Sequence, residues 1–472
     1  MLKLLLISVL SLSLGLKAEE ESHFTRYQEY LRQLIQPQVQ ESENTELSAD
    51  PEFIHLSWQQ STSTAVTITW LTASGDNKNG VRYGKTTSYE IGTVLGSSKQ
   101  SPFSGYIHEV QILMLEPETT YHYSCSPDTG GSWSQDSTFT TGPATKQAFS
   151  FTACGDSRQW FTWPLGNLNG WNTLITQMIQ YEFAFCLFTG DMTYDGDTEE
   201  YWYDWFDKAE PLTRNVPLMP AIGNHETTND ENAEHYQGMF TLPEAAGTER
   251  WYSFDYSAAH FIVLDSENIG NEQQLNWLQA DLAQAADQAS WIIVSLHRPP
   301  YCSGSGPGYH APDSAVQQNW VPLFDQYHVD LVFLGHNHFY QRTFPLYGGN
   351  DPSQPLVTDF HADTYHNPEG SVYVVCGAAG APTLGYIPDN DTGYIAFSEA
   401  GRDHFCLITI SEDDVLHCAT YDKFGVFLDQ FWIHKSLPVP TIRVSWLIIL
   451  ISVMSLMLTR LSRKPSKEIE RG

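Results

Sequence analysis

Five short polar blocks in this sequence carry residue types that bind metal ions. They are Gly155-Asp156-Ser157-Arg158, Gly190-Asp191-Met192-Thr193-Tyr194, Gly223-Asn224-His225-Glu226, Ser295-Leu296-His297-Arg298 and Gly335-His336-Asn337-His338. Carboxylate, amide and imidazole ligands suit hard to borderline ions such as zinc, manganese and iron. A single Gly-Asp pair or His-x-His triplet is common in ordinary turns. Five such blocks in order along one chain predict a metal site.

The segments before these blocks predict the elements that position them. Apolar strands are expected at Ala148 to Cys154, Phe183 to Thr189, Trp291 to Leu296 and Asp330 to Leu334, with helices at Leu165 to Tyr181 and Leu275 to Leu282. This alternation is typical of an α/β domain, in which ligands bind beyond the carboxyl ends of the strands. We therefore expect the blocks to meet at one edge. The acidic and aromatic run Tyr201 to Asp207 is interpreted as a helix face and not as a site.

Residues 51–142 predict a separate β-sandwich. Short runs rich in β-branched and aromatic residues are separated there by turn residues, at His55 to Trp58, Ala65 to Leu71, Gly80 to Tyr83, His108 to Leu113, Thr120 to Cys125 and Asp136 to Thr141. Val66, Ile68 and Trp70 alternate with threonines, which predicts a half-buried strand. Leu115 to Tyr121 resembles the tyrosine corner of a fibronectin type III sandwich. The sandwich is interpreted as a support domain, with a ligand-binding module as the alternative.

The five blocks resemble those of the metallophosphoesterase superfamily, and Tyr194, three residues after Asp191, narrows the resemblance to its purple acid phosphatases. The resemblance covers roughly residues 51–435. It implies a fibronectin III-like sandwich, as in the plant-type enzymes, followed by a four-layer αββα catalytic domain over residues 147–435.

The resemblance also implies a centre of two metal ions. A ferric ion would be held by Asp156, Asp191, Tyr194 and His338. A second ion (zinc, manganese or ferrous iron) would share Asp191 and be completed by Asn224, His297 and His336. His225 matches the family's substrate-side histidine, which contacts the phosphate or protonates the leaving group. Tyr194 bound to ferric iron would give a visible colour.

Arg158 departs from the family pattern, which usually has glycine two residues after the first aspartate. Its guanidinium would lie near the first metal. It could bind a phosphate oxygen, because arginine suits that geometry, or turn away to pair with a surface acid. His235, His310, His361 and His366 lie in loops that could line the pocket, and each is interpreted as a surface or packing residue.

The function implied is an acid phosphatase. Two ions would clamp the phosphoryl group, and a metal-bound hydroxide would attack phosphorus in line while charged His225 donates a proton to the leaving oxygen. One alternative is a metal-dependent phosphodiesterase on the same scaffold, since both reactions need the same clamp. Another is a catalytically inactive cell-surface binding protein.

Composition limits the partners. The chain has 472 residues and a formal net charge of -32, which repels nucleic acid and anionic lipid. Such a surface also repels phosphate esters, so a phosphate site needs local positive charge, which metal ions would supply. Plant-type relatives dimerise, so a homodimer is considered.

There are seven cysteines, and Cys406 and Cys418 flank a turn across which they could pair.

The termini predict entry into the secretory pathway. Residues 1–18 have the pattern of a signal peptide, and residues 19–50 that of a linker. Residues 444–461 are apolar and basic residues follow in 462–472, which predicts a single membrane span with a cytoplasmic tail; a glycolipid anchor and a soluble tail are alternatives. Asn390 begins a glycosylation sequon. The catalytic domain is expected on the lumenal or extracellular side of the cell surface or endolysosomal membrane, or to be secreted.

Overall fold

The computed structural model describes residues 47–75, 79–158, 170–304, 309–383, 385–387 and 392–435. The predicted signal peptide, membrane span and cytoplasmic tail lie outside these residues, as do Asn390 and most of the predicted linker. Among the helices of the described residues, none is both long and apolar enough to cross a membrane.

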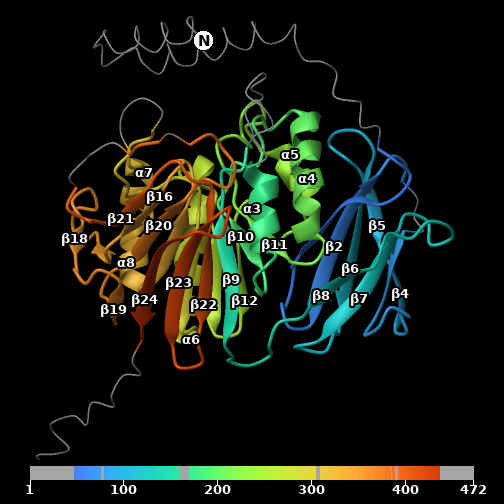
Figure 1. Ribbon diagram of the computed structural model, residues 1–472, viewed down its shortest axis with the longest axis horizontal. Coiled ribbons are helices and arrows are strands. Elements are labelled where there is room, and N and C mark those ends of the chain that lie inside the picture. Colours follow the sequence, from blue (N-terminus) through green and yellow to red (C-terminus); the bar gives the residue numbers. More distant parts are fainter. Residues whose placement is uncertain are drawn as a thin grey trace, which may run out of the picture. The chain divides into compact units, whose positions relative to one another are not determined.

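Two four-stranded antiparallel sheets form the N-terminal sandwich (Figure 1). One sheet contains, in spatial order, β1 (Glu52–Ser57), β2 (Ala65–Thr72), β6 (Tyr106–Leu113) and β5 (Ser97–Gln100). The other contains β4 (Gly92–Leu95), β3 (Gly80–Gly84), β7 (Thr120–Ser126) and β8 (Ser137–Thr140). The tyrosine corner is confirmed, because the Tyr121 hydroxyl accepts the backbone N–H of Glu116 at 3.0 Å.

The prediction of a half-buried β2 is wrong, since every residue of that strand is buried. The alternating apolar side chains face the sandwich core, as expected. The threonines on the other face are covered too, and the Thr69 hydroxyl lies 3.4 Å from that of Thr241 in the catalytic domain. Next to it, Tyr123 of β7 donates a hydrogen bond to the Arg214 carbonyl at 2.6 Å. The sandwich therefore packs firmly against the catalytic domain.

Two seven-stranded sheets form the centre of the catalytic domain. The first contains, in spatial order, β11 (Leu218–Pro220), β10 (Cys186–Phe188), β9 (Phe149–Cys154), β22 (His404–Ile410), β23 (Val415–Asp422), β24 (Phe427–His434) and β19 (Thr364–His366). The second contains β12 (Tyr252–Tyr256), β13 (Ala259–Val263), β14 (Trp291–Ser295), β15 (Leu331–Leu334), β20 (Val372–Cys376), β16 (Tyr340–Thr343) and β21 (Ile395–Glu399). A small hairpin joins β17 (Leu346–Tyr347) to β18 (Leu356–Val357).

The two sheets pack face to face. The buried ring of Phe151 in β9 meets the rings of Phe261 in β13 and Phe333 in β15 edge-on, with centroids 5.1 and 6.2 Å away. Such edge-to-face contacts suit aromatic pairs in a close-packed core.

Helices cover the outer face of each sheet. On the first sheet, Trp171 of α3 (Gly170–Met178) packs against Phe188 of β10 and against Trp205 of α4 (Glu199–Thr213). On the second sheet, Leu278 of α6 (Glu272–Gln288) belongs to the same buried cluster as Val294 of β14. The shorter helices are α5 (Glu234–Met239), α7 (Ser314–Asn319) and α8 (Val321–Tyr327). The predicted sandwich followed by a four-layer αββα domain is confirmed.

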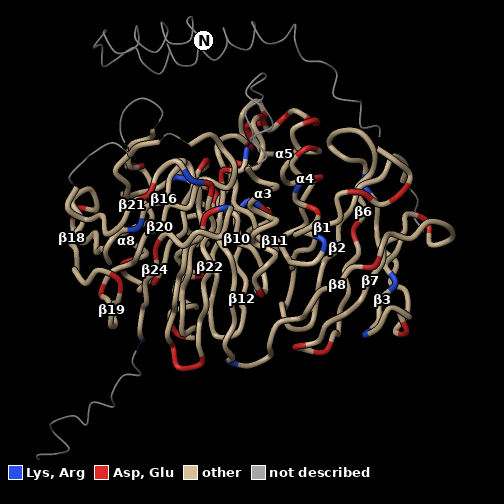
Figure 2. Tube along the Cα trace, in the orientation of Figure 1, with Lys and Arg blue, Asp and Glu red and all other residues tan. Residues whose placement is uncertain are grey.

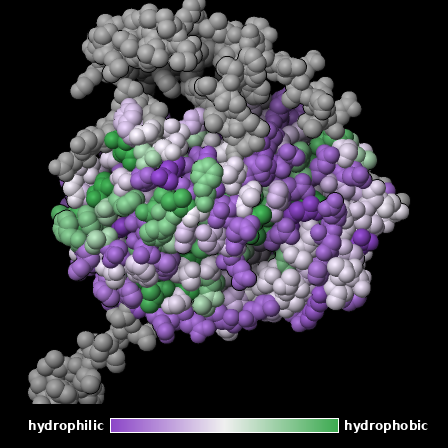
Figure 3. Space-filling view, in the orientation of Figure 1, coloured by the Kyte–Doolittle hydropathy of each residue, from purple (hydrophilic) through white to green (hydrophobic). Residues whose placement is uncertain are grey.

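Acidic residues outnumber basic ones by 56 to 24 in the sequence, and Figure 2 shows acidic positions along both domains. Hydrophilic residues cover much of the face seen in Figure 3, with apolar residues gathered where β18 lies. Leu356 of that strand is 64% exposed.

All seven cysteines are buried free thiols, so the pairing considered for Cys406 and Cys418 is not formed. In the β22–β23 hairpin, Cys406 lies opposite Thr420 and Cys418 opposite Ile408, so the two cysteines are not direct cross-strand partners.

Candidate metal centre

Three of the predicted ligands leave their strands through an unusual backbone conformation. Asp156, Asp191 and His336 follow the ends of β9, β10 and β15 by two or three positions, and their φ angles are +56°, +58° and +70°. Left-handed φ angles are costly for residues with a side chain and persist where the surrounding structure fixes them, often at functional sites. A glycine precedes each one. At Gly335 a Cβ atom would lie 2.5 Å from Asp156 Oδ2 and 2.8 Å from His297 Nδ1, so only glycine fits.

Four predicted ligands converge into one group, which we call the second ligand group: Asp191, Asn224, His297 and His336. His297 Nε2 lies 3.1 Å from Asn224 Oδ1, 3.2 Å from His336 Nδ1 and 3.3 Å from Asp191 Oδ1. His336 Nδ1 lies 2.8 Å from Asn224 Oδ1. Neighbouring ligands bound about 2.1 Å from one ion are roughly 3 Å apart, so these spacings fit a single cation.

The hydrogen bonds of His297 show that its Nε2 nitrogen faces oxygen acceptors in the second ligand group. His297 Nδ1 donates to the Thr189 carbonyl at 2.8 Å, which leaves Nε2 as an acceptor in the neutral ring. Nε2 therefore faces two oxygens that also only accept. Burial lowers the pKa of His297, but the attraction of Asp191 and Asp156 outweighs it and raises that pKa above its ordinary value. The group thus draws positive charge, and a metal ion fits it.

The other predicted ligands, with the shared Asp191, are what we call the first ligand group: Asp156, Asp191, Tyr194 and His338. The Tyr194 ring lies beside Arg158 and His225. His338 donates from Nδ1 to the Pro382 carbonyl at 2.8 Å, which turns Nε2 toward Asp156 Oδ1, 3.5 Å away. Ligand atoms of Asp156, Asp191 and His297 all lie within 4.8 Å of one another, so the two groups adjoin. Burial acts to raise the pKa of Asp191, but His297, His225 and Arg158 hold it well below its ordinary range.

Arg158 points into the first ligand group. Its Nε donates to Asp191 Oδ2 at 3.2 Å, its Nη2 lies 3.4 Å from His338 Nε2, and its Cζ is 5.9 Å from the centre of the Tyr194 ring. The side chain is 12% exposed. Of the two orientations considered from the sequence, turning away to a surface acid is not seen in this structure.

His225 lies over the junction of the two groups. Its backbone N–H donates to Asp191 Oδ1 at 3.0 Å, and Nδ1 donates to the Tyr194 carbonyl at 2.6 Å. Nε2 is left facing Asp191 Oδ2 at 3.9 Å. Burial, and then repulsion from Arg158, lower the pKa of His225 to about 3, so the ring is neutral in the free protein.

Glu226 is a positioning residue that the sequence interpretation missed. Its buried carboxylate accepts the backbone N–H groups of Gly223, Asp191, Met192 and Thr193 at 2.7, 2.8, 2.7 and 3.2 Å. It thereby ties together the loops that follow β10 and β11. The signal in the sequence that could have indicated this role is the position of Glu226 directly after Asn224 and His225.

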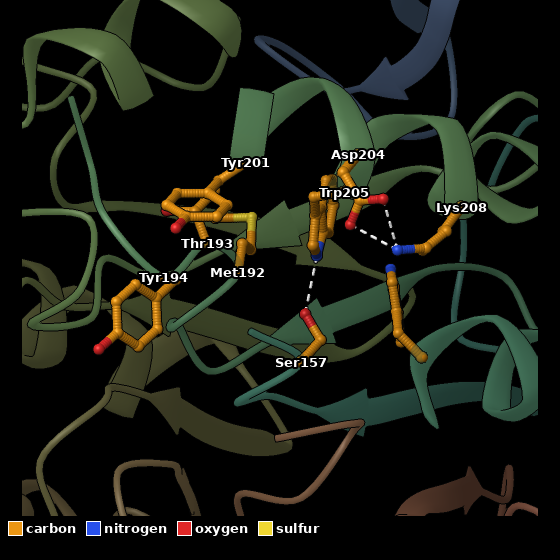
Figure 4. A pocket seen from close by; sticks show the side chains of 9 residues that line it. Ser157, Met192, Thr193, Tyr194, Tyr201, Asp204, Trp205 and Lys208 are labelled. Carbon is orange, nitrogen blue, oxygen red and sulfur yellow. Dashed lines mark hydrogen bonds and ion pairs between the residues drawn. The ribbon is translucent and has the colours of Figure 1, made fainter. Parts of the chain in front are cut away.

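Residues 201–207 lie in helix α4, as the sequence predicted, and this helix also holds a loop of the site. Figure 4 shows a pocket in which Trp205 and Ser157 face each other, and Trp205 Nε1 donates to Ser157 Oγ at 2.7 Å. Ser157 follows Asp156 directly, so the indole holds the loop that carries a predicted ligand. The pocket is also lined by Tyr194, Tyr201, Asp204 and Lys208.

One of the four unassigned histidines lies at the site. The His310 ring stacks on His336, with centroids 3.8 Å apart. The others have different neighbours: His235 pairs with Asp230, His361 pairs with Asp359, and His366 stacks on His434. The only signal in the sequence was that His310 lies in a loop that could line the pocket.

Comparison with known proteins agrees with this geometry. A family model for calcineurin-like phosphoesterases matches residues 149–340, and one for the N-terminal domain of purple acid phosphatases matches residues 51–141. A purple acid phosphatase from yellow lupin (Lupinus luteus) seeds superposes with a TM-score of 0.69 at 22% identity, covering 82% of this chain and 75% of the lupin chain.

Sequence relatives extend over most of the chain. An acid phosphatase type 7 of Mus musculus is 27% identical over 437 residues, which is 82% of this chain and 91% of the mouse protein. An uncharacterized protein of Mycobacterium tuberculosis is 29% identical over 372 residues, 69% of each chain. A probable inactive purple acid phosphatase of Arabidopsis thaliana is 26% identical over 375 residues, covering 67% of this chain and 59% of that protein.

The fold and these matches define a calcineurin-like phosphoesterase, a hydrolase of phosphate esters. Within that class, the chain belongs to the purple acid phosphatase family. Members of this family use a binuclear metal centre, and Asp156, Asp191 and His297 form a cluster here that could hold a metal ion.

Proposed function

We propose that this protein hydrolyses phosphate monoesters at acid pH with two metal ions. The observation that supports this most is the second ligand group, where the oxygens of Asp191 and Asn224 and a ring nitrogen of His336 surround His297 Nε2 at 3.1 to 3.3 Å. Such a cluster is costly to bury unless a cation is bound, because buried polar atoms need partners.

The ions would be divided between the two ligand groups. The first group, with the phenol of Tyr194 and two carboxylates, suits a ferric ion. The second group, with imidazole and amide ligands, suits zinc, manganese or ferrous iron. When bound, such ions supply Lewis acidity, which neutralises the charge of a phosphate ester and lowers the pKa of water.

The chain's own residues would orient the substrate. His225 presents Nε2 at the junction of the groups, held by its bonds to Tyr194 and Asp191. Because its pKa is about 3 in the free protein, it would gain a proton for the leaving oxygen only after the anionic substrate lies beside it. Glu226 would keep Asp191 and Asn224 in place.

The test measures phosphate release at pH 5 from an aryl phosphate monoester and, in parallel, cleavage of a bis-aryl diester. The protein is compared with Asp191→Ala and His225→Ala. We expect monoester hydrolysis by the parent that is lost in Asp191→Ala and reduced about 10²- to 10⁴-fold in His225→Ala, as for a proton-transfer residue.

The other outcomes separate the alternatives. Cleavage of the diester without hydrolysis of the monoester would overturn the proposed acid phosphatase function and favour a phosphodiesterase. A folded, metal-loaded protein that cleaves neither substrate would favour the inactive binding protein.

A further inference from the structure

The two ligand groups differ in what already lies among them. In the second group, Asp191 Oδ1, Asn224 Oδ1 and His297 Nε2 face one another, and within the described residues no arginine or lysine is hydrogen-bonded to these three atoms. In the first group, the acceptors already have a cationic partner. Arg158 lies 3.2 Å from Asp191 Oδ2 and 3.4 Å from His338 Nε2.

The position of Arg158 is fixed by its backbone as well. Its N–H donates to the Asp191 carbonyl at 3.1 Å, and the side chain is largely buried. A guanidinium cannot lose its charge in a protein, so this contact is cationic at every accessible pH. The two acceptors that it satisfies, the outer oxygen of Asp191 and the free nitrogen of His338, are the atoms expected to bind the first metal.

We propose that Arg158 competes with the metal ion for the first ligand group, so that the protein binds one ion tightly in the second group and another weakly in the first. This inference rests on the proposed two-metal function. A cation entering the first group must break two charge-assisted bonds and overcome repulsion from a positive charge a few ångströms away. The glycine usual in the family would offer neither obstacle.

The competition predicts how the affinity of the first ligand group for metal changes when Arg158 is replaced. Replacing Arg158 leaves every predicted ligand in place but removes the competing charge. We therefore expect Arg158→Gly to tighten the weak site about 10- to 100-fold, the range typical of residues that contact metal ligands, and to leave the tight site unchanged. Arg158→Gln, which keeps a polar side chain without the charge, should behave in the same way, whereas Arg158→Lys should keep the weak site.

The experiment titrates the purified, chelator-treated protein with Zn²⁺ alone, following heat and metal content. His336→Ala and His338→Ala assign the sites: the first should abolish the tight site, and the second should abolish only the weak one. Arg402→Gly is the matched control, because Arg402 also contacts two side chains, in its case the acids Glu399 and Asp422, but touches neither ligand group. Thermal melting of each variant shows that it is folded.

The outcomes keep this inference separate from the proposed function. One tight and one weak Zn²⁺ in the parent, with the weak site tightened in both neutral variants, supports the competition. Two equally tight ions in the parent, or a weak site that both neutral variants leave unchanged, would overturn it while leaving the two-metal function intact. A folded parent that binds no Zn²⁺ would overturn both.

Discussion

The ion pairs of His260 give a prediction that can be worked out from the structure. His260 in β13 lies 2.7 Å from Asp255 in β12 through Nδ1 and 2.9 Å from Asp281 in α6 through Nε2. Burial alone would lower the pKa of His260, but the two carboxylates raise it to about 9 from an ordinary value of 6.5. The charged ring therefore joins the β12–β13 hairpin to the helix layer outside it.

The size of the effect follows from linkage. A rise in the pKa of His260 from 6.5 to about 9 is worth roughly 3.5 kcal/mol at most. Because the Asp255 side chain is 77% exposed, its share is screened, and about 2 kcal/mol is the expected contribution. The folded pKa lies above the unfolded one, so this stabilisation is complete below pH 6.5 and is lost as the pH rises through 9.

The assay is urea unfolding of the parent and His260→Gln at pH 6 and pH 10. We expect the variant to be less stable by about 2 kcal/mol at pH 6 and by much less at pH 10, since the neutral ring keeps only hydrogen bonds. His361→Gln is the control, because His361 pairs with one acid but its side chain is 79% exposed. Equal losses for His260→Gln at both pH values would refute the reasoning.

Three further substitutions test how the site and the sandwich are held. Glu226→Gln should weaken Zn²⁺ binding about 10- to 100-fold, because an amide cannot accept four backbone N–H groups; unchanged binding in the titration would contradict its positioning role. Trp205→Phe should cost about 1 kcal/mol and lower phosphate release, since Ser157 loses its partner; the same rate as the parent would show that the Asp156 loop holds itself. Tyr121→Phe should cost about 1 kcal/mol by removing the bond to Glu116, with no change in hydrolysis per folded molecule; a lower rate would argue against a pure support role.

The elements around the predicted blocks could be read from the sequence because each strand is a continuous apolar run. Residues 291–296 and 330–334 were expected as strands, and β14 and β15 occupy Trp291–Ser295 and Leu331–Leu334. Of strands β22 to β24, the sequence indicated only the turn between Cys406 and Cys418, which joins β22 to β23. The place of β22 beside β9 depends on pairing between residues that lie more than 240 positions apart in the chain.

The site was predictable as a set of residue types and not as a set of contacts. Glycine, then a ligand, after a buried strand marked Asp156, Asp191 and His336, although the left-handed φ angles of these residues could not be read from the sequence. The partners that orient them come from other elements. Neither the bond from Trp205 to Ser157 nor the stacking of His310 on His336 follows from spacing, because each joins parts of the chain brought together only by folding.

The central claim is that the two ligand groups bind the metal ions on which hydrolysis depends. The most direct test strips the protein with a chelator, restores Zn²⁺, and measures phosphate release and metal content on the same sample for the parent, His336→Ala and His366→Ala. The control histidine stacks on His434, outside both groups. We predict that Zn²⁺ restores activity to the parent and to His366→Ala but not to His336→Ala, which should also bind less metal. Full activity in metal-free parent, or in His336→Ala, would contradict the account.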